Sequence, residues 1–185
     1  MKLIVWLGNP GKQYEKTRHN AGFMILDNFV ERNKLGTFAY DNKYKGETFQ
    51  ATIDSEKVIF LKPQTFMNLS GESIWAIANF YKIAPADILI IHDEIDLPTG
   101  KIQLKLWWSS AGHNWLKSTI EKLWTLQSWS WSGKDFWRLR IGVDRPATKE
   151  QVVDYVLSTF KPEEKKLLVE QEANIEKLIN EFLGK

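Results

Sequence analysis

The sequence has 185 residues, of which 43% are hydrophobic and 26% are charged. This length and composition suit one compact domain, and they exclude a disordered or fibrous chain. Cysteine is absent, which excludes disulfides and thiolate metal sites, and three histidines leave little for metal binding. We therefore expect any catalysis to use nitrogen and oxygen groups.

The first residues, MKLIVWLGNPG, contain one basic residue and a short apolar run. A signal peptide core or a membrane-spanning helix needs a longer run. We therefore expect a cytoplasmic protein with no membrane partner, folded as a single domain over residues 1–185.

Short β-branched runs alternate with amphipathic stretches along the chain. The predicted strands cover residues 2–7, 56–63, 87–96, 99–106 and 136–143. The predicted helices cover residues 20–33, 70–83, 113–124, 148–160 and 162–183, with Asn20 as N-cap of the first and Pro162 in the first turn of the last. This alternation predicts an α/β fold with helices on both faces of a sheet.

Positive charge is concentrated in residues 100–145, which carry eight basic and three acidic side chains. Such a stretch can face a polyanion, and a phosphate backbone is the commonest one. A solvated basic rim without a partner is the alternative. The basic residues are Lys101, Lys105, Lys117, Lys122, Lys134, Arg138, Arg140 and Arg145.

The first loop contains Gly8 and Gly11 and in part resembles a phosphate-binding turn. A dinucleotide-binding turn requires the helix to begin at its last glycine, so that the helix N-terminus meets the pyrophosphate. Here the segment KQYEKTRH separates Gly11 from the predicted helix. A nucleotide-binding enzyme is therefore the weakest alternative, and we expect no cofactor.

His19 ends this loop, and Asp93 lies at the predicted C-terminal end of a strand. Strand ends of this kind are where α/β sheets assemble their sites. A carboxylate that holds one imidazole nitrogen fixes the tautomer, and the other nitrogen can then accept a proton from water. We expect this pair to form a general base, although a lone histidine can also be a structural cap.

Three loop asparagines, Asn9, Asn68 and Asn114, can bind an ester carbonyl, its oxyanion or a ribose hydroxyl without changing the charge on the base. Each could instead satisfy backbone groups in a turn. Tyr14 and Phe66 offer flat surfaces for a base or a sugar. Because the chain has neither a G-x-S-x-G elbow nor a cysteine, we expect direct attack by water.

Six motifs carry a resemblance over the whole chain. They are LGNPG (7–11), TRHNAGF (17–23), KPQTFMNLSG (62–71), HDEIDLP (92–98), GHN (112–114) and RLRIG (138–142). With these motifs in register, the chain resembles bacterial-type peptidyl-tRNA hydrolases. The resemblance implies a monomeric α/β domain with a mixed sheet, no cofactor or metal, and hydrolysis of the ester that joins a peptide to the terminal ribose of tRNA.

The resemblance also implies roles for individual residues. His19 resembles the proton acceptor, Asp93 the residue that keeps it basic, and Asn9 the position that helps to distinguish peptidyl-tRNA from free aminoacyl-tRNA. Contacts to the tRNA end and the peptide are implied for Tyr14, Phe66, Asn68 and Asn114, and contacts to tRNA phosphate for Lys105 and Arg140. The alternative is a non-catalytic RNA-binding relative, but a binding protein has no need of a general base.

The chain departs from the family pattern at several glycines. The family has glycine where this chain has Trp6, Trp107, Trp108, Trp115, Trp124 and Asp144, and Trp129 and Trp131 lie in an apparent insertion. We hypothesise that a codon read as glycine in the source is translated here as tryptophan; genuine divergence is the alternative. The mass of the protein from its native cell tests this hypothesis. If these positions need a positive φ, each tryptophan costs about 1–2 kcal/mol.

Overall fold

The computed structural model describes residues 1–65, 69–107, 114–123 and 136–184, without the side chains of residues 107, 114 and 115. Across these residues one sheet is built in the order β2-β3-β4-β1-β5-β7-β6. Strands β4, β1, β5 and β7 run parallel, whereas β2, β3 and β6 pair antiparallel to their neighbours. The strands are β1 (Lys2–Trp6), β2 (Ala39–Asp41), β3 (Gly46–Ile53), β4 (Glu56–Pro63), β5 (Ile88–Glu94), β6 (Ile102–Trp107) and β7 (Phe136–Gly142).

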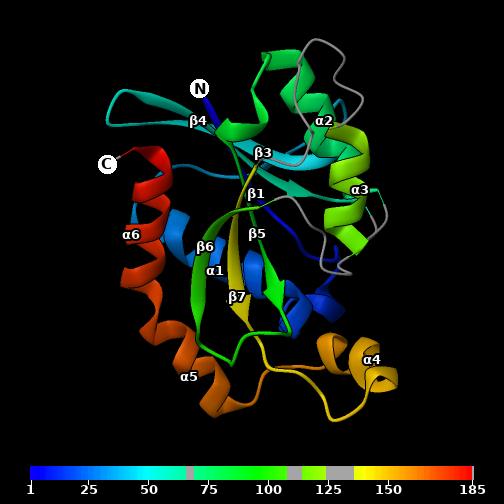
Figure 1. Cartoon of the computed structure of the whole chain (residues 1–185). Coiled ribbons are helices and arrows are strands. Elements are labelled where there is room, and N and C mark those ends of the chain that lie inside the picture. Colours follow the sequence, from blue (N-terminus) through cyan, green and yellow to red (C-terminus); the bar gives the residue numbers. More distant parts are fainter. Residues whose placement is uncertain (66–68, 108–113, 124–135, 185) are drawn as a thin grey trace.

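Helices cover both faces of this mixed sheet, which confirms the predicted α/β class (Figure 1). Helices α1 and α6 pack on one face, and α2 and α3 pack on the other. None of the described helices is long and apolar enough to cross a membrane. The helices are α1 (Ala21–Arg32), α2 (Ser70–Tyr81), α3 (Asn114–Leu123), α4 (Val152–Leu157), α5 (Pro162–Glu170) and α6 (Glu172–Leu183).

Strand β1 shows why the sheet is covered on both sides. Ile4 and Trp6 belong to the core beneath α1 and α6, whereas Leu3 and Val5 belong to the core beneath α2 and α3. Successive side chains of a strand point to opposite faces, so a central parallel strand is apolar at every position. This continuous apolar run is the reason why β1 could be predicted from the sequence.

The hairpin of β2 and β3 was missed by the sequence-based prediction. Strand β2 has three residues, and β3 is an eight-residue strand whose side chains are mostly only partly buried. Such strands mix polar and apolar residues and lack the continuous apolar run of the parallel strands. Two predicted helices were also too long, because 148–160 contains only the short α4 after a 3-10 turn, and 162–183 divides at Gln171 into α5 and α6.

The tryptophans within the described residues that stand at family glycine positions do not have the positive φ that we considered for them. Neither Trp6 nor Trp107 has a positive φ, whereas Asp144, another position where the family has glycine, has a φ of 64°. Trp6 is fully buried and stacks on Phe60 with 5.7 Å between ring centroids, but its indole N–H has no hydrogen-bond partner among the described residues. Trp115 lies within α3, and Trp108, Trp124, Trp129 and Trp131 lie outside the described residues.

Candidate active site

The predicted contact between His19 and Asp93 is present. Asp93 is the penultimate residue of β5, and His19 lies in the 3-10 turn η2 (Arg18–Asn20) just before α1. The His19 Nδ1 atom lies 2.9 Å from Asp93 Oδ1, and both side chains are buried. With a proton on Nδ1, His19 donates to the carboxylate, and its Nε2 lone pair can then accept a proton.

Backbone packing at Gly22 brings these two residues together. The Leu7 N–H donates to the Ile91 carbonyl over 2.9 Å, so β1 and β5 stay paired up to the site. A Cβ on Gly22 would lie 3.0 Å from the Leu7 oxygen and 3.2 Å from the Ile91 oxygen. Because glycine lets the first turn of α1 lie directly on both strand ends, the preceding His19 reaches Asp93.

The Asn20 side chain binds the backbone of Asn9. It makes no capping bond to α1, contrary to the prediction. The Asn9 N–H donates to Asn20 Oδ1 over 2.8 Å, and Asn20 Nδ2 donates to the Asn9 carbonyl over 2.9 Å. No capping bond is made by the Asn20 side chain, although the residue occupies the N-cap position. The sequence-based prediction missed this role, because an asparagine before a helix is ordinarily a cap.

Arg18 anchors the loop that carries His19, and the sequence-based prediction missed it as well. Its guanidinium is buried, donates to both carboxylate oxygens of Glu164 and to Ser158 Oγ, and lies 4.4 Å from the centre of the Tyr155 ring. Burial acts to raise the pKa of Glu164, but hydrogen bonds from Arg18 and from the Lys161 N–H outweigh it and lower the pKa. The pair therefore holds the loop against the start of α5.

The two arginines of strand β7 are less accessible to a ligand than their charge suggests, because one is hydrogen-bonded within the protein and the other is buried. Arg140, a predicted phosphate contact, donates to Glu94 Oε2 over 2.9 Å and to Gln103 Oε1 over 2.8 Å. Arg138 is buried, so of the two open interpretations of the basic stretch, a polyanion contact and a solvated rim, neither applies to its side chain. Burial and the positive charge of Arg140 lower the pKa of Arg138 to about 10, with Glu94 opposing them.

The remaining predicted residues are described only in part. Tyr14 is half-buried in the 3-10 turn η1 (Lys12–Tyr14), and Lys105 is half-buried in β6. Phe66 and Asn68 lie outside the described residues, and Asn114 is the first residue of α3, without a described side chain.

Helices α2 and α3 are in direct backbone contact. The Gly71 N–H donates to Ser118 Oγ over 3.3 Å, and a Cβ on Gly71 would lie only 2.4 Å from the Ser118 carbonyl oxygen. Gly71 is the second residue of α2 and Ser118 is in the second turn of α3. Glycine therefore permits a close approach near the start of both helices.

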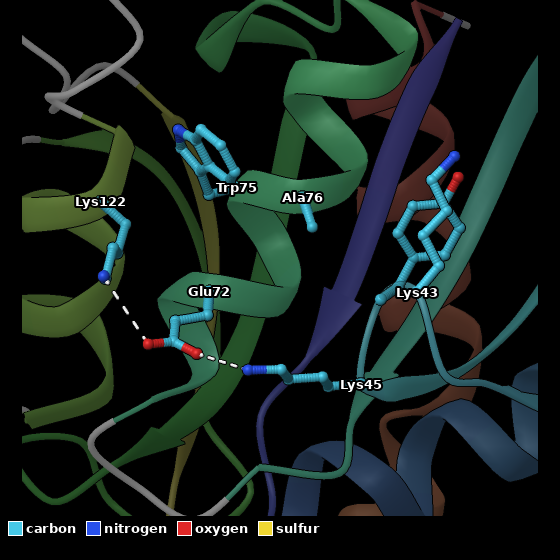
Figure 2. A pocket seen from close by; sticks show the side chains of 7 residues that line it. Lys43, Lys45, Glu72, Trp75, Ala76 and Lys122 are labelled. Atoms are coloured by element: carbon cyan, nitrogen blue, oxygen red, sulfur yellow. Dashed lines mark hydrogen bonds and ion pairs between the residues drawn. The ribbon is translucent and has the colours of Figure 1, made fainter.

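A first pocket, of about 370 Å³, lies along α2 and is lined by basic and aromatic residues (Figure 2). In this lysine pocket Glu72 lies between two lysines, 3.1 Å from Lys45 Nζ and 3.7 Å from Lys122 Nζ. Hydrogen bonding from Lys45 lowers the pKa of Glu72, although desolvation opposes the shift. Lys43 also lines the pocket, so positive charge is in excess there.

A second pocket, of about 670 Å³, borders the candidate site. We name it the amide pocket; Asn9, Asn20, Phe23, Met24, Lys62 and Gln64 are among its lining residues. The hydrogen-bonded residues Asn9 and Asn20 line one part of it, and residues of α1 and of the end of β4 line another. Lys165 and Val169 of α5 also line the pocket. The pocket therefore includes Asn9 and Asn20 but neither His19 nor Asp93, and its volume is large enough for an organic ligand.

Comparison with known proteins agrees with the resemblance. The family model described as "Peptidyl-tRNA hydrolase" matches residues 3–185. The peptidyl-tRNA hydrolase of Desulfitobacterium hafniense is 48% identical over 92% of this chain and 86% of its own, and that of Lactobacillus gasseri is 46% identical over 99% and 93%. A crystal structure of peptidyl-tRNA hydrolase from Acinetobacter baumannii superposes with a TM-score of 0.85 at 34% identity, covering 98% of this chain and 94% of that one. The chain belongs to the peptidyl-tRNA hydrolase family.

Proposed function

We propose that this chain hydrolyses the ester between a peptide, or an N-blocked amino acid, and the 3′-terminal ribose of tRNA, with His19 as the general base. Family membership supports the reaction. The single observation that supports the mechanism is the buried hydrogen bond between His19 Nδ1 and Asp93. A carboxylate in this position stabilises the imidazolium that forms when the ring accepts a proton.

In the proposed reaction, water attacks the ester carbonyl while its proton passes to His19 Nε2. The carbonyl oxygen becomes a tetrahedral oxyanion, and collapse of that intermediate breaks the bond to the ribose oxygen. The imidazolium then returns the proton to the ribose oxygen, which leaves a free ribose hydroxyl and a peptide carboxylic acid that releases its proton to the solvent. No covalent enzyme intermediate is needed, because the nucleophile is water.

Neutral amides fit the rest of this chemistry. We assign Asn9, Asn68 and Asn114 to the ester carbonyl, its oxyanion and the adjoining ribose or peptide groups. Tyr14 and Phe66 are assigned to the flat surfaces of the tRNA end. Lys105 and Arg140 are assigned to tRNA phosphates, and we expect the chain to act as a monomer in the cytoplasm, where its substrate occurs.

The experiment is release of N-acetylated amino acid from N-acetyl-aminoacyl-tRNA, with His19→Ala as the comparison. Loss of general-base catalysis should lower turnover by at least about 10²-fold. Binding of tRNA, measured separately, should persist because the phosphate contacts are intact. Equal turnover in the variant would refute the role of His19, and absence of release by the wild type would support the non-catalytic RNA-binding alternative.

A further inference from the structure

We propose that Arg18 and Tyr155 are positioning residues for the general base, because they connect its loop to the end of β5 by a route separate from the direct hydrogen bond between base and carboxylate. This inference rests on the proposed function, since it takes His19 to be the base. The route leads from Arg18 to the ring and hydroxyl of Tyr155 in α4, and from there through the backbone of Val143 to β5.

The guanidinium of Arg18 joins the loop of the base to the segment between α4 and α5. Its side chain is 3% exposed, and the Arg18 N–H donates to the Ser158 carbonyl over 3.1 Å. The Nη1 atom donates to Ser158 Oγ over 2.6 Å and to the Thr159 carbonyl over 3.0 Å. The Nη2 atom donates to both carboxylate oxygens of Glu164. Because a guanidinium presents its donors in a rigid planar fork, these bonds fix the residue that directly precedes His19.

Backbone pairing joins the same two segments. Thr17 and Thr159 form an isolated antiparallel bridge, and the Phe160 N–H donates to the Lys16 carbonyl over 3.3 Å. Hydrogen bonds between two backbones leave little freedom for one segment to slide past the other. The loop of the base and the segment between α4 and α5 therefore form one unit, so a shift of that segment would also displace His19.

Tyr155 connects this unit to the strand that carries the carboxylate. Its ring lies 4.4 Å from the guanidinium carbon of Arg18, and its hydroxyl donates to the Val143 carbonyl over 2.6 Å. Burial raises the pKa of Tyr155, so the hydroxyl keeps its proton and can donate. The Val143 N–H in turn donates to the Glu94 carbonyl over 3.1 Å. Glu94 directly follows Asp93 in β5, so the route ends one residue from the proposed partner of the base.

The two connections constrain different parts of the proposed base. The hydrogen bond to Asp93 fixes Nδ1 of the His19 ring, and the route through Tyr155 fixes the backbone from which the ring projects. A catalytic group must be held within about 0.5 Å of its productive position, and a misplacement of about 1 Å can lower the rate by about 10²-fold. Weakening the second route should therefore lower kcat with little change in KM, because neither positioning residue is assigned to the substrate.

The first measurement is hydrolysis of N-acetyl-aminoacyl-tRNA by Tyr155→Phe, which keeps the ring over Arg18 and loses only the bond to Val143. We expect kcat to fall by about 10-fold and KM to stay within about 2-fold of the wild type. Tyr81→Phe is the matched control, because the Tyr81 hydroxyl accepts a hydrogen bond from Gln50 over 2.8 Å. Tyr81 ends α2, and Figure 1 shows α2 and α4 at opposite ends of the molecule. This control should keep the kcat of the wild type.

A double variant shows whether the effect passes through the base. Residues that act as a unit are not additive, so Tyr155→Phe should change the remaining turnover of His19→Ala by less than about 2-fold. An equal loss in both backgrounds, or a wild-type kcat for Tyr155→Phe alone, would overturn the proposal. Unchanged turnover in His19→Ala itself would instead contradict the proposed function.

Arg18→Lys replaces Tyr155→Phe in this comparison if the latter does not fold, since lysine keeps the charge but lacks the planar fork. A readout that needs no substrate is the ¹H NMR signal of the His19 Nδ1 proton, which reports the hydrogen bond to Asp93. We expect this signal to shift in Tyr155→Phe or Arg18→Lys and to stay in place in Tyr81→Phe. An unchanged signal in the first two variants would mean that the second route does not set the geometry of the pair, and the proposal would be wrong.

Discussion

Two adjacent carboxylates of β5, Asp93 and Glu94, have different partners. Successive side chains of a strand point to opposite faces, so the two acids meet different surroundings. Asp93 holds the imidazole of His19, whereas Glu94 holds the guanidinium of Arg140. The first pair is the one to which we assign proton transfer, and the second holds the guanidinium of Arg140 in place.

The largest effect should come from Asp93→Asn. An asparagine can donate to His19 Nδ1, which favours the tautomer that has its proton on Nε2 and cannot act as the base. We expect kcat to fall by at least about 10²-fold with little change in KM. Steady-state hydrolysis of N-acetyl-aminoacyl-tRNA measures this, and near-normal kcat would remove Asp93 from the mechanism.

The matched change on the neighbouring residue is Glu94→Gln. Because Glu94 orients Arg140 and not the base, we expect kcat to stay within about 10-fold of the wild type, far less than the loss expected from a missing base. Arg140 loses a charged hydrogen-bond partner, which should lower the free energy of unfolding by about 1.5–3 kcal/mol. Urea denaturation measures the stability, and a loss of turnover equal to that of Asp93→Asn would break the contrast between the two pairs.

Arg140→Ala tests whether this fixed charge reaches RNA. Removing one phosphate contact should weaken tRNA binding and reduce the slope of log K against log salt concentration by about one. The measurement is a binding titration at several salt concentrations. An unchanged slope would show that Arg140 serves only Glu94 and Gln103 and does not contact phosphate.

A smaller, pH-dependent effect is expected at a third carboxylate, Glu164. Its pKa is lowered in the folded state, so its contribution to stability is present above the ordinary glutamate pKa and is lost as the pH falls through the lowered value. At pH 7 the free energy of unfolding of the wild type should exceed that of Glu164→Gln by about 1 kcal/mol, and this difference should vanish in acid. Denaturant unfolding of both proteins between pH 7 and acid pH measures this difference, and a difference that does not change with pH would contradict the prediction.

Much of the fold could be predicted because the central strands are apolar at every position, and the helices that cover them have one apolar face. The β2–β3 hairpin escaped prediction because β3 is half-exposed and therefore mixed in composition. The break between α5 and α6 escaped as well, since Gln171 carries no helix-breaking side chain. A local sequence pattern indicates how buried a segment is and at which spacing its apolar residues recur. In these two segments neither property is distinctive.

The candidate site, like the fold, was predictable from the sequence only in part. The types of group were visible in the sequence: one histidine before a helix, an acid at a strand end, loop amides and a basic stretch. The partners of Asn20, Arg18 and Arg140 were not visible, because they are set by the approach of α1 to β1 and β5, by the position of α5 and by strand order, in that order. His19 and Asp93 are 74 positions apart, and their contact depends on parallel pairing between two strands. By itself, the sequence determined which chemistry is available, and only the tertiary structure decided which side chains meet, since contact between distant residues depends on register and packing.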